Sequence, residues 1–354
     1  MSKRIIALLL ALVMVFALCA CGNGGNGGNG SASDDVGDET YTIRIACENS
    51  DSYPATLGLY QMEKYVESHT NGKVQIEVCA SGQLGGEEET LEQVAQGNLE
   101  MAVASFAPVV SYVPEFEVMD IPFVYNSYTE AWMVLDSYVG TNLLDKMEAQ
   151  GLKGMAYMEN GMRQVTSNVS AINSIADFKG VKLRTMQNNN HMESFSALGA
   201  NPTPVAFSEL YISLSQKVVD AQENPIANVT DKKLYEVQKY LSLTNHIYDA
   251  MPLVCNLEFF NSLPQAYQKV VQAGAIYAQE FSRFCNYERE SLILADLADK
   301  YGMQINEVSA DARAEMAKVA QPAVIKLVAK DIGQDAVDQY MQDVKDVLAQ
   351  ISKF

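Results

Sequence analysis

The pattern of apolar and polar residues divides the chain into an apolar leader, a polar stretch and a long globular part. Residues 5–18 form an unbroken apolar run directly after the basic pair Lys3 and Arg4. Such a run is too short for a comfortable membrane span, but a basic region followed by a short apolar one is typical of a signal peptide. Residues 22–40 are mainly glycine, asparagine, serine and acidic side chains, so we expect a flexible linker there.

From Tyr41 onward, apolar residues recur with the periods of strands and helices. The first strands are predicted at 41–47, 73–79, 99–105 and 155–158. The first helices are predicted at 55–68, from Glu87 onward, and at 129–147. Strands that alternate with helices in this way are typical of a parallel sheet with helices on both faces. The first half of the chain is therefore predicted to be one α/β unit.

A similar pattern starts again in the second half. It predicts a strand at 178–185, a helix at 189–198, an extended segment at 203–205 and a helix ending at Gln216, with Ser208 as its N-cap residue. Long strands are predicted at 241–248 and 251–260, and the chain from Pro264 to Phe354 is expected to be almost wholly helical. Two successive α/β units suggest two lobes with a cleft between them.

Composition limits the partners that such a protein can have. The 354 residues include 44 acidic and 25 basic side chains, which gives a formal net charge of −19. Nucleic acids and anionic lipids both favour a basic surface, so neither is expected as the main partner. A small anion can still bind where a few cations lie together in one site.

Residues that carry catalytic or metal chemistry form no recognisable motif. The three histidines are His69, His191 and His246, and none has a second metal ligand at helical spacing. No Gly-x-Ser-x-Gly motif is present, and no Gly-x-Gly-x-x-Gly motif follows a predicted strand. These observations do not favour an enzyme, and we expect no cofactor.

The cysteines that follow the leader are Cys47, Cys79, Cys255 and Cys285. They are too dispersed for a zinc site, so no metal is expected. An exported protein can form disulfides, but four buried thiols fit the same spacing.

Arg163 and Arg184 are the most informative charged residues. Arg163 follows the strand predicted at 155–158, and Arg184 lies near the end of the strand predicted at 178–185. Ligands of α/β proteins bind beyond the carboxyl ends of strands, so both side chains can face one cleft. A guanidinium group can bind a carboxylate through two parallel hydrogen bonds, which predicts a site for an organic anion. The alternative is that either arginine forms a surface salt bridge.

Ordered motifs extend this hypothesis to a family. The first half contains Gly72-Lys-Val74, Ser81-Gly-Gln-Leu-Gly85, Pro114-Glu-Phe-Glu117 and Ile121-Pro-Phe123. The second half contains Val181-Lys-Leu-Arg-Thr185, Ala197-Leu-Gly-Ala-Asn-Pro-Thr-Pro204, Ala206-Phe-Ser-Glu-Leu-Tyr211 and Val219-Asp-Ala-Gln-Glu-Asn-Pro225. Over roughly residues 41–350 the chain resembles the substrate-binding proteins of tripartite ATP-independent periplasmic (TRAP) transporters, of the DctP type.

The resemblance implies an extracytoplasmic solute receptor and not an enzyme. The implied fold is α/β, two-lobed and like that of periplasmic binding proteins, with a sheet flanked by helices in each lobe, crossing strands and a helical C-terminal region. The first lobe would span residues 41–160, with 250–289 returning to it. The second would span 161–249, with 290–354 as the helical C-terminal region. The implied partners are a small organic-acid anion and the permease subunits in the membrane.

The resemblance also implies most residues of the site. Arg184 matches the family arginine that pairs with the ligand carboxylate, and Arg163 matches a second common arginine. Asn224 matches an asparagine that hydrogen bonds to the same carboxylate. Phe207 matches an aromatic residue that packs against the ligand, and Gln187 occupies a position that often contacts ligand hydroxyl groups.

First-lobe positions bear on the identity of the ligand. Residues 160–164 and 172–177 are similar to those of sialic-acid-binding members, but Ser105 stands where those members have an acid. Glu48 stands where an asparagine is often found, with Asn49 beside it. These residues are expected to contact the remainder of the ligand, and they favour a smaller sugar acid such as a uronate or an aldonate. The alternatives are a C4-dicarboxylate or sialic acid binder, a sensory receptor of the same fold and a lipid-anchored hydrolase.

The end of the leader, Leu18-Cys-Ala-Cys-Gly22, resembles the lipobox of bacterial lipoproteins. In that family the cysteine after the small residue receives the lipid and becomes the mature N-terminus, which here is Cys21. The resemblance implies a signal peptide over 1–20, a lipid-anchored linker over 21–40 and a location at the outer face of the cell membrane. The alternative is an ordinary secreted protein in which Cys21 carries no lipid.

Overall fold

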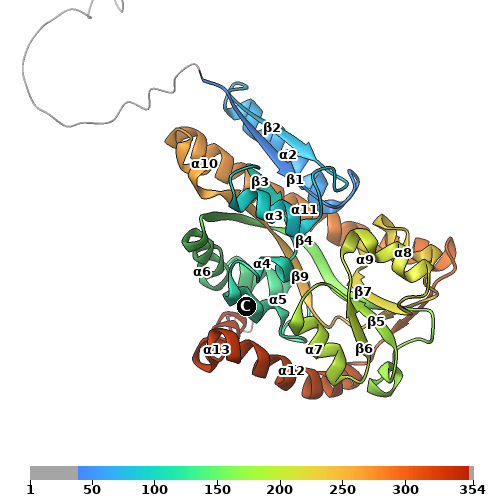
Figure 1. The fold of residues 1–354 in the computed structure, drawn as a ribbon. Coiled ribbons are helices and arrows are strands. Elements are labelled where there is room, and N and C mark those ends of the chain that lie inside the picture. The colour runs from blue at the N-terminus through green and yellow to red at the C-terminus, as the bar shows by residue number, and fades with distance from the viewer. Residues whose placement is uncertain (1–38, 351–354) are drawn as a thin grey trace, which may run out of the picture. The chain divides into compact units, whose positions relative to one another are not determined.

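Two sheets that share a long strand, with helices around them, make up residues 39–350, the part of the chain described by this computed structural model (Figure 1). The predicted signal peptide, Cys21 and nearly all of the linker lie outside the described residues. The described residues belong to one compact unit, Val36–Phe354. No helix within residues 39–350 is both long and apolar enough to cross a membrane.

The first sheet is built on β1 (Tyr41–Ala46), which lies between the parallel strands β2 (Val74–Cys79) and β3 (Met101–Val103). Helices α2 (Pro54–His69) and α3 (Glu87–Ala95) connect these strands. The alternating and helical patterns therefore predicted this part correctly, although β3 is shorter than expected.

The strand β4 (Leu152–Ser167) is longer than its prediction at 155–158, and it is antiparallel. Its first part pairs with β9 (Tyr248–Asn256), which in turn pairs antiparallel with β3. From Arg163 onward β4 pairs with β7 (Ala221–Pro225) and β8 (Tyr240–Leu243) in the second sheet. The prediction of a fourth parallel strand was therefore wrong, and Arg163 lies within a strand. Buried polar residues from Glu159 onward interrupt the apolar pattern from which strands are predicted.

The second sheet contains three short parallel strands, β5 (Lys182–Thr185), β6 (Asn201–Pro204) and β7. β10 (Gln304–Glu307), which the sequence did not predict, pairs with β8. The surrounding helices are η3 (Ile175–Phe178), α7 (Asn189–Ala197), η4 (Phe207–Glu209), α8 (Leu210–Ser215), α9 (Ile226–Asp231) and η5 (Leu234–Glu236). Ser208 lies in η4 and not at the N-cap of α8, which is Glu209, so that prediction was wrong.

The helix predicted at 129–147 is two helices, α5 (Tyr128–Leu135) and α6 (Tyr138–Lys146). The side chain of Ser137 accepts a hydrogen bond from the backbone N–H of Val139 and so caps a new helix where the apolar spacing continues. The nearby short helices are α4 (Phe106–Val109), η1 (Pro114–Asp120) and η2 (Met147–Gln150).

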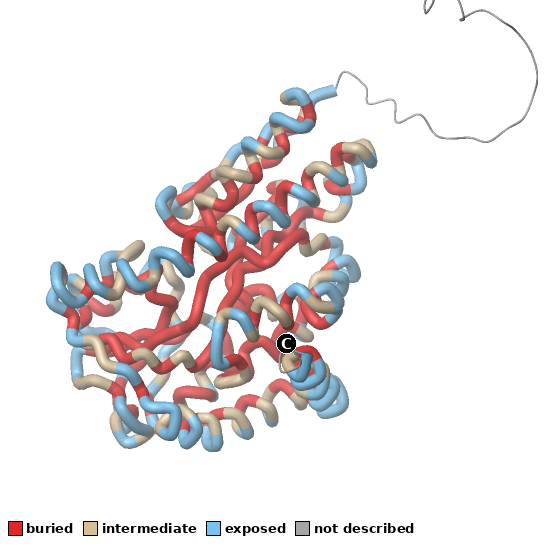
Figure 2. The backbone as a smooth tube through the Cα atoms, turned by 180° about the vertical axis from the view of Figure 1, so that it is seen from behind, coloured by how far each residue is buried: buried red, intermediate tan, exposed pale blue. Residues whose placement is uncertain are grey.

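Long helices dominate the C-terminal part, as the sequence predicted. They are α11 (Gln265–Asp299), α12 (Ala310–Ile332) and α13 (Gln334–Leu348). The six-residue helix α10 (Leu257–Ser262) precedes them and replaces the end of the strand predicted at 251–260, so that part of the prediction was wrong. One apolar cluster joins α2 and α11 to the first sheet, and another joins this sheet to α3, α5, α6, α12 and α13. Figure 2 shows the result: the backbone is buried along the central strands, such as β4 and β9, and buried and exposed positions alternate along the helices.

Candidate functional site

A pocket of about 260 Å³ lies at the ends of strands from both sheets. Its lining includes all but one of the residues predicted for the site, namely Glu48, Asn49, Ser105, Arg184, Gln187, Phe207 and Asn224. The loop after β1 and the start of α3 supply one side, and β5, η4 and β7 supply the other. The rule that ligand sites form beyond the carboxyl ends of strands therefore located the pocket.

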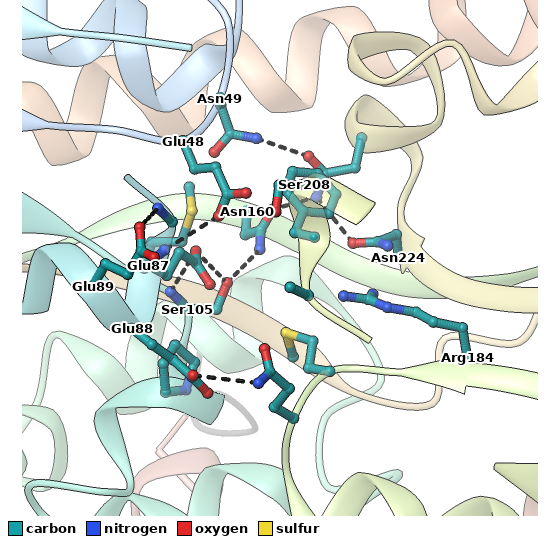
Figure 3. Close-up of a pocket in the computed structure, with 18 residues that line it drawn as sticks. Glu48, Asn49, Glu87, Glu88, Glu89, Ser105, Asn160, Arg184, Ser208 and Asn224 are labelled. Atoms are coloured by element: carbon teal, nitrogen blue, oxygen red, sulfur yellow. Dashed lines mark hydrogen bonds between the residues drawn. The ribbon is translucent and has the colours of Figure 1, made fainter. Parts of the chain in front are cut away.

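Arg184 reaches the pocket from β5, and Figure 3 shows its guanidinium group pointing into the pocket. The residue is only 1% exposed. Its Nε donates a hydrogen bond to the backbone oxygen of Val205 at 2.8 Å, whereas Nη1 is buried and has no partner among the described residues. Burial lowers the pKa of Arg184 to about 10. The pocket thus contains a desolvated cation with an unused donor, which suits an anion.

Arg163 does not line the pocket. Its guanidinium group is fully buried behind the pocket wall, in ion pairs with Glu223 at 2.5 Å and Asp249 at 2.7 Å. Burial alone would lower its pKa, but these carboxylates outweigh burial and raise it. One further hydrogen bond, 3.3 Å long, runs from its Nη2 to Oδ1 of Asn224. The structure therefore brings one of the two predicted arginines to the pocket, and the other supports a lining residue.

A chain of asparagine side chains connects the two sides of the pocket. Asn49 donates to Asn228 at 2.9 Å, and Asn228 donates to Asn160 at 3.0 Å and to Asn224 at 3.2 Å. Asn224 donates to Gln222 at 2.6 Å, so its side chain is engaged by protein partners at both ends. Sequence reasoning missed Asn160 and Asn228: Asn160 stands in a recognised motif but was given no role in the site, and Asn228 lies outside every motif.

Acidic side chains form the side of the pocket that faces Arg184 (Figure 3). Glu48 comes from the loop after β1, and Glu87, Glu88 and Glu89 come from the first turn of α3. From the sequence, these three acids could be interpreted only as residues that interact favourably with the positive end of a helix. Burial, and then the charge of Glu48, raise the pKa of Glu87 to about 8. Burial also raises the pKa of Glu48.

The remaining predicted residues also line the pocket. The backbone N–H and the hydroxyl of Ser105 donate hydrogen bonds to Glu87 at 2.9 and 3.0 Å. Ser105 stands where sialic-acid-binding members have an acid, and in this structure the carboxyl group of Glu87 lies beside it. Gln187 donates to Glu88 across the pocket at 3.3 Å. The Nζ of Lys232 lies 4.6 Å from the centre of the Phe207 ring.

The sequence left open whether the four cysteines after the leader form disulfides or remain thiols. Cys47, Cys79, Cys255 and Cys285 are free and buried. Among residues 39–350, no group of three or more histidine, cysteine and acidic side chains could hold a metal ion.

Comparisons with known proteins agree on one family. The chain matches the DctP model, bacterial extracellular solute-binding protein, family 7, over residues 45–331. It is 31% identical to the C4-dicarboxylate-binding periplasmic protein DctP of Rhodobacter capsulatus, over 80% of this chain and 85% of that protein. It is also 31% identical to the sugar acid binding protein DctPAm from Advenella mimigardefordensis in complex with galactonate, with a TM-score of 0.83 over 87% of this chain and 99% of that one. A TRAP periplasmic solute binding protein from Polaromonas sp. JS666, bound to D-erythronate, is 34% identical to this chain. Its TM-score is 0.80, over 85% of this chain and 98% of that one.

Proposed function

Because the chain belongs to the DctP family of bacterial extracellular solute-binding proteins, we propose that it captures a sugar acid such as an aldonate or a uronate. The family consists of extracytoplasmic binding proteins of TRAP transporters, which bind organic acids and are not enzymes. The lipid-anchored hydrolase considered from the sequence finds no support in this family.

The observation that carries the proposal is the buried Nη1 of Arg184, which has no hydrogen-bond partner among the described residues. A buried donor without a partner costs free energy, and a ligand carboxylate that accepts from it removes this cost. Arg163 then acts indirectly, because it holds Asn224 in the wall beside the ligand.

The size and polarity of the pocket favour a small hydroxylated acid. A cavity of about 260 Å³ is at the lower end of the range for small-molecule sites. Amide and carboxyl groups from Glu48, Asn49, Asn160 and Gln187 line it and can hydrogen bond to hydroxyl groups. A C4-dicarboxylate, which the Rhodobacter relative is named for, is the second candidate, and sialic acid is a third.

We propose that the two sheets mark two lobes that close on the ligand, residues 41–160 with 250–289 and residues 161–249. Hydrogen bonds between these segments cross the pocket in support: Asn49 to Asn228, Gln187 to Glu88, and Lys232 to the backbone oxygen of Glu48. A ligand that contacts both segments favours the closed state, and the permease in the membrane would recognise that state.

The leader motif supports a further proposal, that lipid attached to Cys21 holds the protein at the outer face of the membrane. In cells, the wild type should sediment with membranes, and Cys21→Ser should be released into the soluble extracellular fraction. Equal release of both proteins would contradict the anchor and favour ordinary secretion.

A thermal-shift panel tests the proposed function directly. It would contain aldonates, uronates, sialic acid and C4-dicarboxylates. A ligand present at about a hundred times its Kd adds ~2.7 kcal/mol to the free energy of unfolding. We expect at least one sugar acid to raise the melting temperature and to be recovered unchanged. Release of a reaction product, or no shift with any organic acid, would contradict the proposal.

A further inference from the structure

We propose that Glu48 and Glu87 determine which organic acids the pocket accepts: they bind hydroxyl groups at the end of the ligand away from Arg184, and they exclude a second carboxylate there. This inference rests on the proposed function, because it assumes that Arg184 binds the first carboxylate.

Two buried polar atoms in the pocket have no hydrogen-bond partner among the described residues, and they are of opposite kinds. Nη1 of Arg184 is a donor, and Oε1 of Glu48 is an acceptor. Arg184 is 1% exposed and Glu48 is 8% exposed, so both atoms are desolvated. Their side chains enter the pocket from opposite sides (Figure 3). A ligand that satisfies both needs an acceptor at one end, such as a carboxylate, and a donor at the other, such as a hydroxyl group.

The charges of the lining residues support the same selection. Arg184 is the only cation among them, whereas Glu48, Glu87, Glu88 and Glu89 are all present. No ion pair within residues 39–350 joins Arg184 to any of these acids. The backbone N–H of Glu87 donates to Glu48 at 3.3 Å, which holds the two residues together. A second ligand carboxylate would meet the like charge of Glu48, and of Glu87 once that residue is ionised, in a partly desolvated wall, and such repulsion is a common source of specificity.

Glu87 also makes the selection depend on pH. The groups that act on it are Glu48 from the loop after β1, Ser105 before α4 and Asp249 in β9, and Arg184 faces it across the pocket. Because burial and Glu48 raise the pKa of Glu87 to about 8, the residue is mainly protonated at neutral pH and loses its proton in mild base. The penalty on a second carboxylate should therefore grow as the pH rises through about 8.

The test uses pairs of ligands that differ only at the far end. D-galactonate and galactarate have the same hydroxylated chain, but the terminal CH₂OH of galactonate is a carboxylate in galactarate. D-erythronate and meso-tartrate form a shorter pair of the same kind. Calorimetric titration of the wild type should give a Kd about tenfold or more lower for the monocarboxylate of at least one pair.

Variants identify the residues responsible. Glu48→Gln and Glu87→Gln each remove a carboxyl group with little change in shape. Glu92→Gln, on the exposed face of the same helix α3, is the matched control for charge. The preference for the monocarboxylate should fall about fivefold or more in Glu48→Gln, and in Glu87→Gln above pH 8, and it should not change in Glu92→Gln. Melting without ligand confirms that each variant is folded.

The outcomes separate this inference from the proposed function. If the wild type binds the dicarboxylate of each pair as tightly as the monocarboxylate, the inference is wrong but organic-acid binding stands. A preference that neither Glu48→Gln nor Glu87→Gln reduces would also overturn it. If no acid in either pair or in the thermal-shift panel binds, the proposed function fails, and the inference fails with it.

Discussion

Arg163 and Arg184 are equally buried but have different partners. The guanidinium group of Arg163 is enclosed by Glu223 and Asp249, whereas that of Arg184 has no ion pair among the described residues. An unpaired buried cation destabilises the folded state, whereas removal of a paired one takes a charged partner from each buried carboxylate that it contacts. Truncation of the two side chains should therefore have different effects on stability and on binding.

We expect Arg163→Met to lower the free energy of unfolding by ~3–5 kcal/mol, because Glu223 and Asp249 would remain buried without the guanidinium group that they share. Arg184→Met is the matched control, and its free energy of unfolding should be unchanged or higher, because the substitution removes a desolvated charge. Urea unfolding followed by circular dichroism measures both. An equal loss of stability in the two variants would contradict the assigned partners.

Seven of the 18 residues that line the pocket could be predicted from the sequence and its motifs, but the partners of those residues could not. Glu223 and Asp249 lie 60 and 86 positions from Arg163, and no local pattern relates them to it. The sequence shows three acids in the first turn of α3, where negative charge interacts favourably with the N-terminal end of a helix. This interaction accounts for the acids, so they gave no indication of a pocket. The roles of Asn160 and Asn228 became recognisable only in the fold, where Asn228 donates hydrogen bonds to both Asn160 and Asn224.

Among the elements, helix α11 is the long support of the first sheet, and its contact with α2 depends on a glycine. A Cβ atom at Gly58 would lie 2.6 Å from the backbone oxygen of Ala278 and 2.8 Å from Cε of Met158. The first of these atoms belongs to the α11 backbone, so the helices would have to move apart. Periodicity predicted both helical regions correctly but gave no information on their separation.

Gly58→Ala should lower the free energy of unfolding by ~1–3 kcal/mol, although alanine is normally the better helix former. Lys64→Ala, at an exposed position of α2, is the control and should change this free energy by less than ~0.5 kcal/mol. Denaturant unfolding of both variants is the measurement. Stabilisation by Gly58→Ala would show that the two helices have room for a side chain.

For the whole molecule, the α/β fold and the family inferred from ordered motifs are confirmed. The parallel sheet expected for the first half is wrong at β4, because β9, from later in the chain, lies between β3 and β4 and pairs antiparallel with both. The division into two lobes and the anchor at Cys21 stay predictions.

The net charge of this protein does not by itself predict the charge of its ligand. The chain has a formal net charge of −19. The proposed ligand is nevertheless an anion, which one buried guanidinium group would bind. The acids near that group do not prevent binding of a monocarboxylate, but they limit what the rest of the ligand can be. We therefore propose that a single local group, the guanidinium of Arg184, binds the ligand carboxylate.

The most direct test is calorimetric titration of wild type and Arg184→Ala with D-galactonate and with the tightest acid of the panel. Loss of the guanidinium group leaves a buried carboxylate without its partner, at a cost of ~3–5 kcal/mol. We predict that Arg184→Ala, still folded by circular dichroism, binds about a hundredfold more weakly or worse. Binding within a factor of about three of the wild type would contradict the account.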